Sequence, residues 1–184
     1  MDLPVELPLK EILPGILMFT LPVDYGIDHV NIYLIRDGEG WCLFDTGADC
    51  EAARALWLRA LAGPLVGGLT RIIVSHHHPD HLGLAAWLAQ STGAKILMRP
   101  EEREVARATR MLDETSRRQG IDFMLRHGLS LGEAEEIVSG VLHENLGCDE
   151  PPPGSSLENG QRLQIGDFGF DVLVLGGHSI AQIC

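Results

Sequence analysis

Basic residues are scarce in this chain of 184 residues. It has 14 Lys and Arg against 26 Asp and Glu, which gives a net charge of −12, and its lysines are Lys10 and Lys95. Such a chain lacks the general positive field that attracts nucleic-acid backbones and anionic membranes. A local arginine patch remains compatible with it. We therefore do not expect nucleic acid as a partner.

Cysteine pairs, a leader and membrane spans are missing as well. No two of the four cysteines have the C-x-x-C spacing, which favours a reducing compartment over a disulfide framework. The first residues show no basic stretch followed by a long apolar run, so no secretory signal is expected. No segment approaches the roughly 18 uninterrupted apolar residues of a transmembrane helix. The sequence thus predicts a cytoplasmic protein without a membrane segment.

The chain has the composition of a globular domain, with 45% hydrophobic and 22% charged residues. Short apolar runs bounded by turn residues predict strands: 16–21, 30–35, 41–44, 70–74, 95–98, 163–165 and 168–175. Helical spacing is found over 50–62, with Asp49 as the expected N-cap, and over 84–92, with Gly93 as the expected end. Strands that alternate with helices indicate an α/β fold.

Residues 101–150 differ from the rest and predict a helical insert. Four arginines recur at three and four residues and so share one helix face: Arg99, Arg103, Arg107 and Arg110. In the favoured interpretation this is a solvated face whose arginines pair with the acids nearby, which are Glu101, Glu102, Glu104 and Glu114. The alternative is an anchor for the anionic tail of a substrate.

A histidine cluster stands between a predicted strand and a predicted helix, where residues 75–83 read Ser-His-His-His-Pro-Asp-His-Leu-Gly. His76 and His78 lie two residues apart and project from the same side of an extended segment. Pro79 biases His78 away from helix, and Asp80 and His81 follow at the turn. A purification tag would lie at a terminus. Imidazole and carboxylate ligands suit zinc, iron or manganese, so the cluster predicts a metal site.

These residues resemble a known family. His76-x-His78-x-Asp80-His81 resembles the metal-binding signature of the metallo-β-lactamase superfamily. The motifs Asp45-Thr46-Gly47 and Gly177-His178-Ser179 resemble those that precede and follow it. The resemblance implies an αββα sandwich with a metal centre, usually dinuclear and most often zinc. It also implies that His76, His78 and His178 hold one metal, and that Asp80 and His81 contribute to the second.

The chain departs from the family pattern in two places. The third motif has Gly176 where the family commonly has proline. The family also normally continues to a bridging aspartate and a final histidine, which nothing between His178 and Cys184 supplies. We therefore expect one domain over 1–184, with the helical insert at about 101–150, that is incomplete at its C-terminus. It would be an N-terminal portion of a longer member, unless the site itself is incomplete.

The expected activity is that of a metal-dependent hydrolase, because a bound metal supplies hydroxide near neutral pH. Asp80 would orient that hydroxide, and Asp45 would orient a ligating histidine or the metal loop, although Asp45 could also simply bond within its own turn. A small ester, thioester or lactone is the favoured substrate. The alternatives are a phosphodiesterase or ribonuclease of the same superfamily, and a non-catalytic metal-binding scaffold. A homo-oligomer in which another subunit donates a ligand is compatible with the sequence.

Overall fold

The centre of the protein is a six-stranded sheet in the order β1-β2-β3-β4-β5-β6. The structure is a computed structural model that describes residues 7–24, 26–111, 113–146 and 154–184. The strands of the sheet are β1 (Leu9–Leu13), β2 (Ile16–Pro22), β3 (His29–Asp37), β4 (Gly40–Phe44), β5 (Leu69–Ile73) and β6 (Lys95–Leu97). The strands predicted over 16–21, 30–35, 41–44, 70–74 and 95–98 are confirmed. The first of the six strands was not predicted and pairs with β2 at the edge of the sheet.

The sheet changes from antiparallel to parallel at β4. Hairpins connect β1 to β4, whereas α1 (Glu51–Ala62) connects β4 to β5, and α2 (Pro79–Leu82) and α3 (Ala85–Thr92) connect β5 to β6. Parallel neighbours need such crossover connections. Because β4, β5 and β6 run in the same direction, the segments that follow them leave from the same edge of the sheet.

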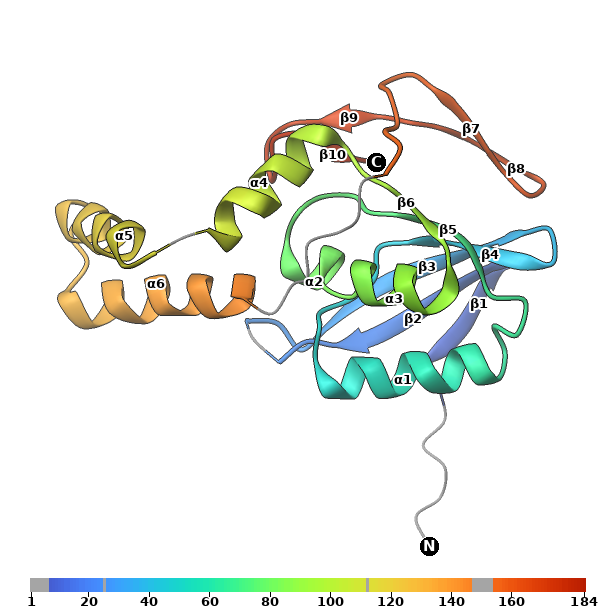
Figure 1. Cartoon of the computed structure of the whole chain (residues 1–184), viewed down its shortest axis with the longest axis horizontal. Coiled ribbons are helices and arrows are strands. Elements are labelled where there is room, and N and C mark those ends of the chain that lie inside the picture. The colour runs from blue at the N-terminus through green and yellow to red at the C-terminus, as the bar shows by residue number, and fades with distance from the viewer. Residues whose placement is uncertain (1–6, 25, 112, 147–153) are drawn as a thin grey trace, which may run out of the picture.

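Helices cover one face of the sheet, and short strands cover the other (Figure 1). In β3 the buried residues Val30, Ile32 and Leu34 alternate along the strand and belong to the core beneath α1 and α3. Trp57 of α1 packs edge-on against Phe19, with ring centroids 5.2 Å apart. On the opposite face lie two two-stranded sheets, formed by β7 (Arg162–Ile165) with β8 (Phe168–Asp171) and by β9 (Val174–Leu175) with β10 (Gln182–Ile183). This mixed architecture confirms the predicted α/β fold class.

Three helices follow β6, in the region where the sequence predicts a helical insert. They are α4 (Pro100–Arg110), α5 (Glu114–Arg126) and α6 (Leu131–Leu146). The helices α5 and α6 extend away from the sheet (Figure 1) and share a small apolar cluster of Ile121, Ala134 and Val138. The carboxylate of Asp113 accepts the Ser116 N–H and caps α5. Of the residues in α4, Ala106 belongs to the core beneath the sheet, so this helix packs against it.

Two local predictions need correction. Asp49 does not cap α1: the N-cap is Cys50, whose side chain makes no capping bond. Both oxygens of Asp49 are occupied by the Arg54 guanidinium at 2.6 and 2.7 Å, a two-point ion pair that replaces the cap. The strand predicted over 168–175 is divided into β8 and β9. Gly93, by contrast, ends α3 in the left-handed conformation as predicted, with φ of 77°.

Cys42, Cys50 and Cys184 are free thiols, and Cys148 lies outside the described residues. None of the helices in the described ranges is both long enough and apolar enough to cross a membrane.

Candidate metal centre

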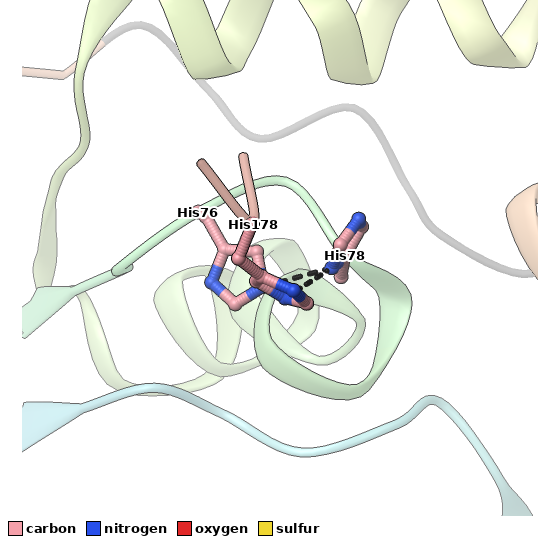
Figure 2. A group of neighbouring side chains, drawn as sticks. All are labelled: His76, His78 and His178. Carbon is pink, nitrogen blue, oxygen red and sulfur yellow. Dashed lines mark hydrogen bonds between the residues drawn. The ribbon is translucent and has the colours of Figure 1, made fainter. Parts of the chain in front are cut away.

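Three histidines from two distant segments point at one spot (Figure 2). His76 and His78 lie in the loop between β5 and α2, and His178 lies in the loop between β9 and β10. Nδ1 of His78 is 2.9 Å from Nε2 of His76 and 2.9 Å from Nε2 of His178. The two Nε2 atoms are 3.1 Å apart. The three nitrogens thus form a nearly equilateral triangle.

The spacing and the protonation of these nitrogens fit a metal ion. Nitrogen ligands lie about 2.0–2.1 Å from zinc, and three nitrogens in such a triangle can all reach one cation at that distance. Burial is the main reason why the pKa of His76 falls to about 3, and the nearby His81 lowers it further. Burial also lowers the pKa of His78, together with the neighbouring His77. Neutral imidazole is the form that binds a metal, so these two rings are ready to do so.

The ring of His76 is held in place by a hydrogen-bonded chain that starts at Asp45. The carboxylate of Asp45 accepts the backbone N–H of Ser75 at 2.7 Å and the Ser75 hydroxyl at 2.9 Å. The Ser75 oxygen in turn lies 2.8 Å from Nδ1 of His76. Asp45 is buried and has a φ of 63°, in the left-handed region that few residues other than glycine adopt. This conformation places the carboxylate beneath the loop that carries His76.

His81 lies beside the three-histidine group and between two carboxylates. Its Nδ1 is 2.9 Å from Asp45, its Nε2 is 3.1 Å from Asp80, and its ring centroid is 4.3 Å from that of His76. Burial acts to lower the pKa of His81, but the hydrogen bonds with Asp45 and Asp80 outweigh it and raise the pKa to about 10. Burial likewise acts to raise the pKa of Asp80, and the bond from His81 brings it below its ordinary value. Asp80 and His81 therefore form an ion pair at the edge of the site.

Glu102 of α4 connects the two segments that carry the histidines. It accepts the backbone N–H of His77 at 3.1 Å, its Oε2 is 2.5 Å from Nδ1 of His77, and its Oε1 accepts the Ala181 N–H at 2.6 Å. Burial acts to raise the pKa of Glu102, but the hydrogen bonds from His77 and Ala181 hold it below its ordinary value. The prediction that Glu102 belongs to the solvated arginine face is wrong, because its side chain is fully buried.

The other members of the arginine face behave differently. Arg107 pairs with Glu104 at 2.7 Å, and Arg99 pairs with Glu101 at 2.6 Å and with Glu158 at 2.9 Å. The exposed pair of Arg107 with Glu104 agrees with the favoured interpretation, whereas only 13% of the Arg99 side chain is exposed, so that Arg99 is ion-paired but not solvated. Glu114 pairs with Arg117 and Arg118 of α5.

The structure brings all the predicted site residues to one edge of the sheet. His76, His78 and His178 form the group that could hold a metal, Asp80 and His81 adjoin it, and Asp45 lies below. Sequence reasoning missed Ser75 and Glu102. A signal for Glu102 was present in the sequence, because residues four apart share one face of a helix and Glu102 lies four residues before the apolar Ala106. These two are the buried residues of α4. Ser75 offered no signal beyond its place next to His76.

Comparison with known proteins identifies the family of the chain. The sequence pattern of the metallo-beta-lactamase superfamily matches residues 25–184, so the chain belongs to that superfamily. A probable metallo-hydrolase of Bacillus subtilis (strain 168), YqjP, is 31% identical over 71 residues, which cover 38% of this chain and 22% of that protein.

Two solved structures show the same fold. A beta-lactamase domain protein from Burkholderia ambifaria is 27% identical with a TM-score of 0.82, and the match covers 95% of this chain and 51% of that one. TTHA1623, solved in a di-iron-bound form, is 26% identical with a TM-score of 0.53, and the match covers 88% of this chain and 64% of that one. The chain thus spans about half the length of the Burkholderia structure.

Proposed function

We propose that this chain forms the metal-binding part of a metal-dependent hydrolase that acts on a small ester, thioester or lactone. The observation that carries the proposal is the triangle of histidine nitrogens, 2.9 to 3.1 Å on a side, with Asp80 and His81 next to it. Membership of a superfamily that consists mostly of hydrolases supports it. Because the chain spans about half of the Burkholderia structure, turnover is proposed for the whole protein and metal binding for the residues described.

Each residue of the site has a proposed role. His76, His78 and His178 would hold one ion, and Asp80 and His81 would contribute to a second. A divalent cation at such a site lowers the pKa of water towards neutrality and polarises the oxygen of a carbonyl group. Asp80 would accept a hydrogen bond from the attacking water and orient it. His81 would first have to release the Nε2 proton that it donates to Asp80, while Nδ1–H still donates to Asp45, so that binding at the second position releases a proton.

Zinc is the proposed metal, because neutral imidazoles with a carboxylate nearby are typical zinc ligands. The di-iron form of TTHA1623 supports iron as the next candidate. Manganese fits the carboxylates but prefers fewer nitrogen ligands. Metal content after growth in media with each metal would distinguish the three.

A small neutral or weakly charged substrate agrees best with the charge of the protein. The net charge of −12 repels polyanions, and two of the arginines that could bind an anionic tail, Arg99 and Arg107, are paired with acids. A ribonuclease of the same superfamily would need a positive groove. Arg99 and Arg107 do not supply one, because acids neutralise their charges.

Metal analysis tests the proposal. The protein is stripped with a chelator, loaded with zinc, dialysed and analysed for bound metal. We expect zinc to be retained by the parent chain and by a His127→Ala control, because the exposed His127 contacts the carbonyl and the ring of Phe123 at the end of α5. We expect His178→Ala, which keeps two of the three histidines, to bind zinc too weakly to retain it through dialysis. A parent chain that retains no zinc would contradict the proposal.

The substrate class needs a separate measurement. Metal-loaded protein is incubated with a thioester, a lactone and a phosphodiester, and hydrolysis is followed for each. Faster cleavage of the thioester or lactone supports the proposed class, and cleavage of the phosphodiester alone would favour the nuclease alternative. Metal binding without any turnover would favour the non-catalytic scaffold.

A further inference from the structure

The carboxylate of Glu102 is the buried acid of α4, and it faces two loops rather than an arginine. One of its oxygens accepts the His77 backbone N–H and contacts the His77 ring, and the other accepts the Ala181 N–H at 2.6 Å. A carboxylate without solvent contact is stable only when its oxygens are hydrogen-bonded, and here both are. The side chain therefore fixes the distance between two backbone segments.

Those two segments carry the histidine ligands. His77 lies between His76 and His78, and Ala181 lies three residues after His178 in the loop between β9 and β10. Among the described residues, the backbone bond from Ile183 to Ser75, at 2.9 Å, also connects the two segments. That bond lies at the base of the loops, whereas the contacts of Glu102 lie nearer to the ligands.

We propose that Glu102 is a positioning residue that holds the His178 loop against the His76–His78 loop and so prepares the three nitrogens for the metal. The inference rests on the proposed function, since it assigns these histidines as ligands. His178 is the exposed member of the group, and its loop contains few regular backbone pairs. Without the hydrogen bonds of Glu102, the His178 loop would have to be ordered when the metal binds. The free energy of that ordering would lower the affinity for the metal.

The test measures the affinity of the chelator-treated protein for cobalt(II), through the visible absorption of the bound ion. Glu102→Gln keeps the size of the side chain, but its NH2 group faces an N–H donor in one of the two loops. We expect it to bind cobalt about 10- to 100-fold more weakly than the parent, the range typical of groups that orient metal ligands. Glu104→Gln is the matched control, because Glu104 lies on the same helix, is largely exposed and pairs with Arg107; its affinity should equal that of the parent.

A second comparison separates positioning from a general loss of stability. In a His178→Ala background, Glu102→Gln should weaken cobalt binding by less than about threefold, because the ligand that it positions is gone. An equal loss in both backgrounds would overturn the inference, and so would a Glu102→Gln variant with the affinity and absorption of the parent. Circular dichroism confirms that each variant is folded. If Glu102→Gln does not fold, Glu102→Asp is used instead, because it keeps the charge but cannot span both loops.

The two proposals fail in different ways. A parent chain that binds no cobalt overturns the metal site and, with it, the inference. A parent chain that binds cobalt through His178, together with an undisturbed Glu102→Gln variant, overturns the inference alone.

Discussion

The hydroxyl of Ser75 lies 2.8 Å from Nδ1 of His76, and this contact determines which nitrogen of the ring is free. Because a carboxylate can only accept, the Ser75 O–H donates to Asp45, and the Ser75 oxygen then accepts a hydrogen bond from the Nδ1–H of His76. Nε2 is left with its lone pair towards His78 and His178. A serine between a carboxylate and a histidine thus fixes the tautomer that the proposed metal site requires.

Ser75→Ala is expected to weaken metal binding without unfolding the protein. The substitution removes the acceptor for Nδ1, so that the His76 ring is free to take the other tautomer or to rotate. We expect zinc affinity, measured by competition with a chromophoric chelator, to fall about 10-fold or more. Ser91→Ala removes an exposed hydroxyl that bonds the Trp87 carbonyl within α3, and should leave the affinity unchanged. Equal affinities in the two variants would contradict the role of Ser75.

Asp45→Asn is expected to cost more stability than any exposed substitution of the same kind. The carboxylate faces three donors: the Ser75 N–H, the Ser75 hydroxyl and Nδ1 of His81. The amide group of Asn turns one acceptor into a donor and leaves a buried group unsatisfied, which costs about 1–3 kcal/mol. Urea denaturation of metal-free protein measures the change. Asp167→Asn, in the exposed turn between β7 and β8, should have no effect; a similar loss at both positions would contradict the argument.

The raised pKa of His81 predicts how metal-free stability depends on pH. The unfolded chain releases this proton near pH 6.5 and the folded chain near pH 10, so between these values the folded state holds more protons. The contribution of His81 to the free energy of unfolding is therefore complete below about pH 6.5. It falls as the pH rises, by at most about 1.4 kcal/mol per pH unit. His81→Gln should show a flatter profile between about pH 7 and pH 9 in chelator-treated urea titrations. Parallel profiles for parent and variant would contradict the assignment.

Local patterns were sufficient to predict the part of the site that lies on consecutive residues. The strand before the cluster, the turn at Pro79 and the helix ended by Gly93 follow from short-range spacing, and the structure has β5, α2 and α3 at those places. His178 is different, because it lies 100 residues from its partner His78. Only the resemblance to a family connected the two, since no local rule specifies which distant loop returns to a given strand.

The errors of the sequence interpretation have a common physical cause. Glu102 and Asp49 were interpreted through their nearest neighbours in sequence, as a member of a charged helix face and as a helix cap. Other partners decide both: Glu102 bonds two loops far from it in sequence, and Asp49 is occupied by Arg54, five residues further along the chain. A polar side chain satisfies its hydrogen bonds wherever the fold offers partners, and the sequence does not show which loops those are.

Gly83 is the position where a single methyl group would be expected to damage the site most directly. A Cβ there would lie 2.5 Å from the Pro79 carbonyl oxygen, 2.7 Å from the Asp49 nitrogen and 2.9 Å from the Gly47 oxygen, all of them backbone atoms that cannot rotate away. Gly83→Ala must therefore push the loop after β4 away from α2, which is expected to cost about 1–3 kcal/mol of unfolding free energy. Because Asp45 lies in that loop and His81 lies in α2, zinc affinity should fall in the same variant. The comparison is Gly132→Ala in α6, where a Cβ meets nothing within 4 Å and the helix should gain up to about 1 kcal/mol. Urea denaturation of both variants measures the change in the free energy of unfolding. A Gly83→Ala protein as stable as the parent would show that α2 and the loop after β4 are not in close contact.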